Sequence, residues 1–304
     1  MAGQLVECVP NISEGRDESA VAAAAEAVAG VRGVALLDRS MDPDHNRSVL
    51  TFAGSPEAVV EAAVRLVRCA AERIDLTKHD GVHPRIGAAD VVPFVPVRGL
   101  TLEDCARLAR AAGGEIWRRC RVPVYLYGAA ASHPVRAVLS WLRRGGFEML
   151  RQEAVRDPER APDIGGPALH PTAGACAVGA RKFLIAYNIN LAGEDIHLAR
   201  RIARRIRGSS GGFPHVQALG VYLPSRRQAQ VTMNLVDFAH IPVEQVYQTV
   251  SEEASRGGTA IAGCEIIGLI PRKAFEMAPA FYMRAANFRP DIVLETRLAA
   301  LESK

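Results

Sequence analysis

The predicted order of strands and helices repeats once along the chain, and this repeat limits the possible folds more than any other feature. In the first half, the spacing of apolar residues predicts strands at 5–9, 33–38, 47–52 and 91–97, with helices at 21–28 and from 55 onward. In the second half it predicts strands at 182–189, 217–223, 230–236 and 260–269, with helices at 194–206 and 242–254. Each half therefore has the order βαββαβ, which is that of a ferredoxin-like unit.

We expect an α/β (α+β) protein of two related ferredoxin-like subdomains, at 1–179 and 180–304. Each is expected to be a mixed sheet with helices on one face, and the two are expected to form a cleft between them. The first half also carries an extra helix, strand and helix at 101–112, 122–127 and 135–142, and the second opens its final helix at 271–278. A chain of 304 residues is long enough for two such cores.

A stretch rich in proline and glycine, at 156–173, separates the two repeats. Such composition between periodic segments predicts a domain linker. Loops longer than about 12–15 residues in compact proteins are usually functional or disordered. The stretch is therefore either a spacer or a clamp that folds over a ligand.

Composition excludes several functional classes. A net charge of +4 is small for this length and argues against a nucleic-acid binder. The six cysteines show no CxxC pair, which favours reduced thiols in a cytoplasmic protein. No signal peptide and no apolar run of membrane-spanning length is visible. Five arginines on the helix at 194–206 and just after it predict a solvated face, namely Arg200, Arg201, Arg204, Arg205 and Arg207.

The segment at 78–87 is dense in polar side chains and lacks a hydrophobic period. It holds His79, His83 and Arg85, and Gly81 and Pro84 interrupt its backbone, so we expect a structured loop. Histidine has an unperturbed pKa near neutrality, which suits proton transfer. The alternative is a pair of solvated histidines beside a turn.

Two other polar segments have two readings each. The segment at 11–15 follows the first strand and suits a small-ligand site, unless Ser13 or Asp17 simply caps the next helix. The segment at 42–48 is either a turn rich in Asp and Asn or a metal site. We expect no metal, because no second group of His or carboxylate residues has suitable spacing. Phosphate-loop, nucleophile-elbow and HExxH motifs are absent.

Seven segments taken together resemble the glutamate formimidoyltransferase (formiminotransferase) family, in its stand-alone bacterial form. They are ECVPNISEG at 7–15, NRS at 46–48, HPR at 83–85, PVRG at 96–99, VPVYLYG at 122–128, GARKFLIAYNIN at 179–190 and NLVDF at 234–238. They occur in the family's order, and the likeness spans nearly the whole chain. The resemblance implies an N-terminal and a C-terminal subdomain of a formiminotransferase, with no cyclodeaminase domain.

The resemblance implies transfer of the formimino group from N-formimino-L-glutamate to N5 of tetrahydrofolate, in histidine degradation. Tetrahydrofolate is then a co-substrate, and the family's proton-accepting histidine matches His83. The family's folate-binding stretch matches Gly165, Gly166, Pro167, Ala168, Leu169, His170, Pro171, Thr172, Ala173 and Gly174.

For substrate binding we add Asn11, and we add Arg47 and Arg85 as candidates for holding carboxylates by paired hydrogen bonds. Paired subdomains with apolar helices favour a homodimer. Two alternatives stay open: a related folate enzyme that acts on a formyl donor or on 5-formyltetrahydrofolate, and a folate-binding protein without turnover. His79 has no assigned role.

Overall fold

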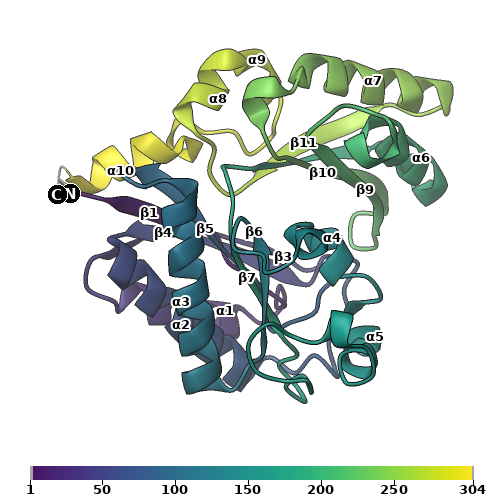
Figure 1. Ribbon diagram of the computed structural model, residues 1–304. Coiled ribbons are helices and arrows are strands. Elements are labelled where there is room, and N and C mark those ends of the chain that lie inside the picture. Colours follow the sequence, from purple (N-terminus) through teal and green to yellow (C-terminus); the bar gives the residue numbers. More distant parts are fainter. Residues whose placement is uncertain (1–2, 303–304) are drawn as a thin grey trace. The chain divides into compact units, whose positions relative to one another are not determined.

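The computed structural model describes residues 3–302 and separates into two compact units. The first runs to Arg181 and the second begins at Lys182 (Figure 1). Each unit has its own sheet and is described by itself.

The described part of the first unit is built on a seven-stranded sheet. Its strands are β1 Leu5–Cys8, β2 Asn11–Ile12, β3 Val34–Asp42, β4 Arg47–Gly54, β5 Ala89–Arg98, β6 Val124–Gly128 and β7 Cys176–Ala180. From one edge the order is β3, β4, the short pair β1 and β2, β5, β7 and β6. Pairing is antiparallel up to β5, and β7 runs parallel to both β5 and β6. The unit is thus a ferredoxin-like sheet extended by two parallel strands.

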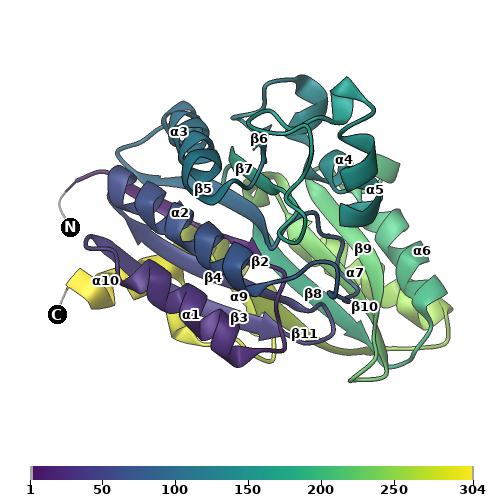
Figure 2. The same cartoon turned by 90° about the horizontal axis from the view of Figure 1, so that it is seen from below.

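Three long helices cover one face of this sheet: α1 Glu18–Ala29, α2 Pro56–Arg73 and α3 Leu102–Cys120 (Figure 2). Leu50 and Phe52 of β4 point into the core beneath them, so the intervening residues of β4 face the other way. The two short helices α4 Leu139–Leu142 and α5 Gly146–Glu153 pack on that opposite face, where Leu142 and Leu150 join a smaller core. The expectation that helices cover only one face of the sheet is therefore wrong for this unit.

The stretch at 156–173 is not the linker between the two units. Strand β7 follows it and pairs between β5 and β6, so the stretch lies inside the first unit. Strand β7 is not evident in the sequence, because most of its residues are small and carry little strand propensity. They are small because space is short: a Cβ on Gly179 would lie 2.5 Å from the ring of Tyr127.

The described part of the second unit has a four-stranded sheet in the order β11, β8, β10, β9. Its elements are β8 Ile185–Leu191, α6 Ile196–Ile206, β9 Val216–Leu223, β10 Gln228–Leu235, α7 Val243–Arg256 and β11 Ile261–Ile267. All pairings are antiparallel, so the expected mixed sheet is wrong here. The cause is that this unit adds no parallel strand to the βαββαβ core.

The expected final helix is broken into pieces, because Pro279 ends the first of them and begins the next. The pieces are α8 Arg272–Met277, α9 Pro279–Met283 and α10 Leu294–Glu302. Short 3-10 helices occupy Pro134–Ala137, Pro158–Arg160, Gly208–Ser210, Phe238–His240 and Pro290–Ile292.

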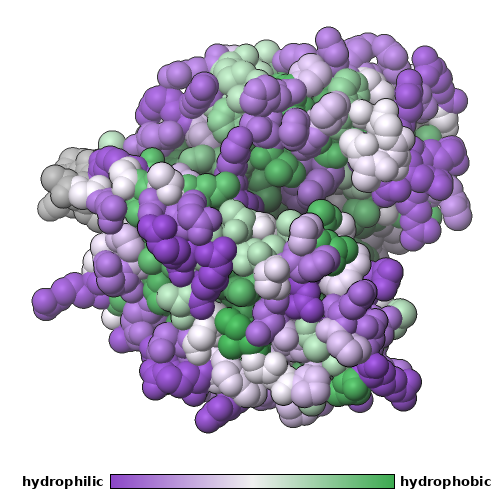
Figure 3. All heavy atoms as spheres, viewed as in Figure 1, coloured by the Kyte–Doolittle hydropathy of each residue, from purple (hydrophilic) through white to green (hydrophobic). Residues whose placement is uncertain are grey.

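Hydrophilic residues cover most of the face of the molecule shown in Figure 3. Arg200, Arg201, Arg204 and Arg205 of α6 are exposed, which confirms the solvated face predicted for that helix. Arg207, the fifth arginine of that prediction, is half-buried and donates to Ser210. Among residues 3–302, no helix combines the length and the apolar character needed to cross a membrane.

Candidate functional site

The three polar segments of the first unit are joined to one another by hydrogen bonds. Ser13 reaches the third segment, because its amide donates to the Ala88 carbonyl at 2.8 Å and its Oγ to the Gly87 carbonyl at 2.7 Å. Asn46 bridges all three: Oδ1 accepts from the Gly15 amide and Nδ2 donates to the Asp80 carbonyl, each at 2.9 Å. Asp17, not Ser13, caps α1. The segments at 11–15, 42–48 and 78–87 therefore form one site.

Two glycines permit this close approach. A Cβ on Gly15 would lie 2.1 Å from the Asp42 carbonyl oxygen, and one on Gly81 would lie 2.5 Å from that of His45. Neither position has room for any other residue, so the glycines are part of how the three segments meet.

His83 is held in a defined tautomer. Its Nδ1 lies 2.8 Å from the Pro84 carbonyl oxygen, which can only accept, so Nδ1 carries the hydrogen and Nε2 is the basic nitrogen. Burial lowers the pKa of His83 well below its usual value, and the charges of Arg47, Arg143 and His45 lower it further. The ring of His45 lies beside that of His83, with centroids 5.9 Å apart. At neutral pH the imidazole of His83 is uncharged and able to accept a proton.

Two arginines supply positive charge beside His83. Arg47 begins β4, and Arg143 follows α4, where its Nη2 bonds the buried carboxylate of Asp90. Asp90 also accepts from the Ile86 amide at 2.7 Å. The Nε atoms of Arg47 and Arg143 are both buried without a hydrogen-bond partner. Burial, and then the charge of Arg143, lower the pKa of Arg47 to about 9.

Arg85 lies in the histidine loop with its guanidinium engaged by protein atoms. It donates to Glu148 at 2.8 and 2.9 Å and to His79 Nδ1 at 2.9 Å. His79 Nε2 lies 2.9 Å from the Asn46 carbonyl. Through these contacts, Arg85 and His79 hold the loop in place.

The stretch from Gly165 to Gly174 runs beside the histidine loop. Ala173 accepts from the Ala88 amide at 2.9 Å, and Ala175, just beyond the stretch, donates to the Ile86 carbonyl at 3.0 Å. Backbone hydrogen bonds join His170 and Gly174 in both directions, which closes a tight turn. The residues at 166–168 are exposed, so their backbone is open to a ligand.

Asn11 lies in β2 and is buried, and its side-chain Nδ2 donates to the Val9 carbonyl at 3.1 Å. Arg143 and Asp90 were not among the site residues predicted from the sequence. Asp90 had a detectable signal, a single acidic residue at the start of an otherwise apolar strand. Arg143 had none, because it follows a short helix at the end of a weakly periodic segment.

The segment at 42–45 follows turn chemistry. Asp42 Oδ1 accepts from the amides of Asp44 and His45, at 2.9 and 2.8 Å. Among residues 3–302, no group of three or more His, Cys, Asp or Glu residues is arranged to hold a metal ion.

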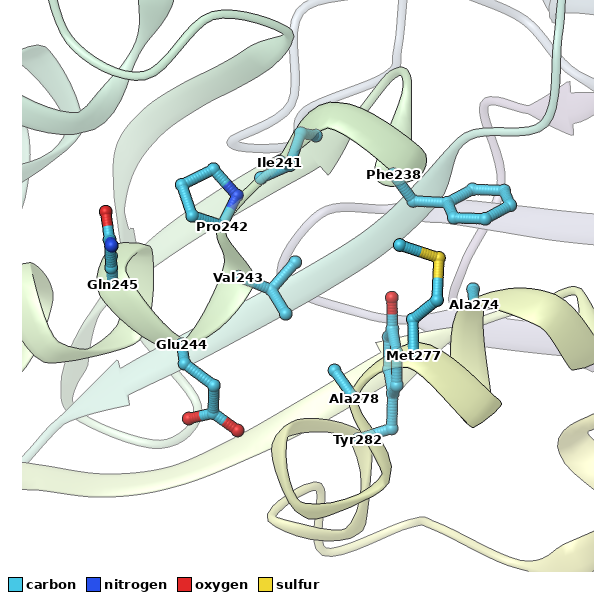
Figure 4. A pocket seen from close by; sticks show the side chains of 10 residues that line it. All are labelled: Phe238, Ile241, Pro242, Val243, Glu244, Gln245, Ala274, Met277, Ala278 and Tyr282. Carbon is cyan, nitrogen blue, oxygen red and sulfur yellow. The ribbon is translucent and has the colours of Figure 1, made fainter.

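A cavity of about 260 Å³ in the second unit has a different character. Figure 4 shows Phe238, Met277 and Tyr282 gathered on one side and Glu244 and Gln245 on the other. Its remaining lining residues are Ile241, Pro242, Val243, Ala274 and Ala278. The Glu244 carboxylate is held by Arg284 at 2.8 Å, and the histidine and arginine cluster of the first unit has no counterpart in this lining. We therefore place the candidate active site in the first unit.

Comparison with known proteins agrees with the motifs. The family model described as "Formiminotransferase domain, N-terminal subdomain" matches residues 5–181, and that described as "Formiminotransferase domain" matches residues 186–298. A solved structure of a microcompartments protein from Desulfitobacterium hafniense DCB covers 87% of this chain and 94% of its own, at 12% identity and a TM-score of 0.24. That similarity is too low to inform fold or function.

Two relatives match over nearly their whole length. The chain is 41% identical to "Glutamate formimidoyltransferase" of Streptococcus pyogenes serotype M1, over 94% of this chain and 95% of the relative. It is also 41% identical to "Glutamate formimidoyltransferase" of Thermoplasma acidophilum, over 97% of each. "Formimidoyltransferase-cyclodeaminase" of Sus scrofa is 44% identical over 93% of this chain, which spans 53% of that longer protein. The chain belongs to the formiminotransferase domain family.

Proposed function

We propose that this protein is a one-carbon transferase, a glutamate formimidoyltransferase that moves the formimino group from N-formimino-L-glutamate to N5 of tetrahydrofolate. The full-length likeness to two proteins of that name supports the reaction. The observation that carries the proposal within the chain is the neutral His83, whose Nδ1 hydrogen is held by Pro84 so that Nε2 is the nitrogen able to accept a proton.

His83 then acts first as a base and later as an acid. Its Nε2 accepts the proton from N5 as the bond from N5 to the formimino carbon forms. It returns that proton to the departing nitrogen of glutamate as the bond from that nitrogen to the formimino carbon breaks. A positioned base contributes about 10²–10⁴-fold to such transfers, and alignment of the two substrates supplies most of the rest.

The residues from Gly165 to Gly174 are proposed to hold tetrahydrofolate, supported by the exposed backbone at 166–168 and by the contact of this stretch with the histidine loop. Asn11 and Arg47 remain proposed substrate contacts. For Arg85, the bonds to Glu148 and His79 favour a role in holding the loop. A cytoplasmic homodimer is our further expectation, to be checked by light scattering on the purified protein.

The test is an assay of the purified protein with formiminoglutamate and tetrahydrofolate, measuring released glutamate and 5-formiminotetrahydrofolate. A parallel assay supplies a formyl donor, and a third measures folate binding alone. Glutamate release from the formimino donor supports the proposal. Turnover of the formyl donor alone, or folate binding without any turnover, favours the corresponding alternative. If His83→Ala bound folate normally and transferred at the parent rate, the role of His83 would be wrong.

A further inference from the structure

The two arginines beside His83 each have a buried Nε that makes no hydrogen bond. The Nε groups of Arg47 and Arg143 are fully buried hydrogen-bond donors with no acceptor. An unmade hydrogen bond of a buried donor is costly, and more so for a charged group. Two such donors on neighbouring guanidinium groups indicate that a bound ligand supplies their acceptor.

The charges point to an anionic acceptor. Arg47 comes from β4 and Arg143 from the end of α4, and the charge of each lowers the pKa of His83. The carboxylates of Asp90 and Asp42 raise the pKa of Arg47, so both lie close enough to act on its charge. Asp90 already accepts hydrogen bonds from Arg143 and from the Ile86 amide. Asp42 accepts hydrogen bonds from two backbone amides of the turn that it begins. Guanidinium groups donate paired hydrogen bonds to carboxylates and phosphates, and both proposed substrates carry carboxylates.

The chemistry of the two substrates decides which carboxylate this is. In the formimino donor, the α-carboxylate and the reacting nitrogen are bonded to the same carbon atom. In tetrahydrofolate, a whole aminobenzoyl group separates the glutamate from the ring system that bears N5. A carboxylate site beside the proton-accepting histidine therefore fits the donor.

We propose that Arg47 and Arg143 form a carboxylate-binding subsite that holds the α-carboxylate of the formimino donor beside His83. This inference rests on the proposed function, because it takes the reaction and the role of His83 from it. Arg143 is thereby a substrate-binding residue, and Asp90 is a positioning residue that fixes the Arg143 guanidinium.

The subsite also couples donor binding to the basicity of His83. Burial is the largest cause of the lowered pKa of His83, and the charges of Arg47, Arg143 and His45 lower it further. A bound carboxylate offsets the two arginine charges and so raises the pKa of His83 towards its ordinary value. His83 is then a stronger base with the donor bound than without it.

The experiment compares Arg143→Gln and Arg47→Gln with Arg118→Gln, a control on an exposed arginine of α3 that pairs with Glu115. Steady-state assays measure KM for the donor and for tetrahydrofolate separately. Calorimetry with L-glutamate measures carboxylate binding without turnover. Loss of one charged hydrogen-bond pair predicts that donor KM and the Kd for glutamate rise about 10- to 100-fold, while KM for tetrahydrofolate and the control stay at parent values.

Arg143→Gln leaves Asp90 without its cation and is at risk of misfolding. The double variant Asp90→Asn/Arg143→Gln keeps a neutral hydrogen-bonded pair and carries the same expectation. A third measurement follows the His83 ring by NMR in the parent protein, where saturating glutamate should raise its pKa.

The inference is overturned if transfer proceeds and the arginine variants leave glutamate binding unchanged, in which case the proposed function still stands. It is also overturned if KM for tetrahydrofolate rises in place of donor KM, because the subsite then serves the folate glutamate. If the parent protein binds glutamate through these arginines yet transfers no formimino group, the subsite stands and the proposed function fails.

Discussion

Arg85 donates a hydrogen bond from Nε to Nδ1 of His79 at 2.9 Å, and this contact fixes the tautomer of that histidine. Because an arginine nitrogen can only donate, His79 Nδ1 is the acceptor, and Nε2 carries the hydrogen that the Asn46 carbonyl accepts. His83 has the opposite tautomer, with its hydrogen on Nδ1. Both ring nitrogens of His79 are used in holding the loop, whereas His83 keeps a basic nitrogen for chemistry.

The first prediction concerns the paired bonds between Arg85 and Glu148. Arg85→Lys keeps the charge but cannot reproduce the planar fork that reaches Glu148 and His79 together. We expect a loss of about 1–3 kcal/mol in the free energy of unfolding. We also expect kcat to fall by up to about 100-fold, because a displaced loop misplaces His83. Urea denaturation and steady-state assays measure the two effects.

Arg118→Lys is the matched control for that substitution, since Arg118 makes an exposed pair with Glu115 on α3. Exposed pairs contribute about 1 kcal/mol or less, so stability and kcat should stay near the parent values. Equal behaviour of Arg85→Lys and Arg118→Lys in both measurements would contradict the bracing role of Arg85.

The three polar segments that the structure brings together were visible in the sequence, because polar residues between apolar strands stand out. The polar pattern singled out the loop that holds His83 and the segment that holds Arg47, whereas the choice of His83 as the base came from the family resemblance. Arg143 and Asp90 were not predicted, because an ion pair between residues far apart in the sequence leaves no local pattern. Strand β7 was not predicted, because its residues are kept small by the packing of Tyr127 against Gly179. The tautomers of His79 and His83 are likewise set by partners that only the folded chain brings close.

The second prediction is a loss of stability in mild acid. Burial lowers the pKa of His79, His83 and His170 in the folded state, so the unfolded chain binds more protons below about pH 6.5. The free energy of unfolding should therefore fall as the pH drops from about 7 to about 5, with a slope of at most about 1.4 kcal/mol per pH unit for each histidine. Urea titrations at several pH values measure that slope. His83→Ala should make it shallower, and an unchanged slope in that variant would count against the lowered pKa of His83.

The third prediction concerns the end of the proposed folate stretch. Gly174 has a φ of +68°, and a Cβ there would lie 2.2 Å from the Ile86 carbonyl oxygen. Gly174→Ala should cost about 1–3 kcal/mol of stability and raise KM for tetrahydrofolate, because the stretch must shift away from the histidine loop. Gly114→Ala in the interior of α3 meets no atom within 4 Å and should stabilise the protein by about 0.5–1 kcal/mol. Thermal denaturation that ranks the two variants the other way would refute the argument.

The last prediction separates the backbone of Asn46 from its side chain. This residue has a φ of +45°, and its buried amide joins Gly15 to Asp80. Asn46→Gly keeps the backbone conformation and removes both hydrogen bonds, so it should cost about 1–3 kcal/mol of stability. Asn46→Ala removes the same bonds and adds strain at positive φ, so it should cost about 1 kcal/mol more. Both variants should lower kcat, because the loop that carries His83 loses its link to the segment at 11–15. If Asn46→Gly matched the parent in urea denaturation and in kcat, Asn46 would contribute only its backbone conformation, and the three segments would be held together by Ser13 and the backbone bonds.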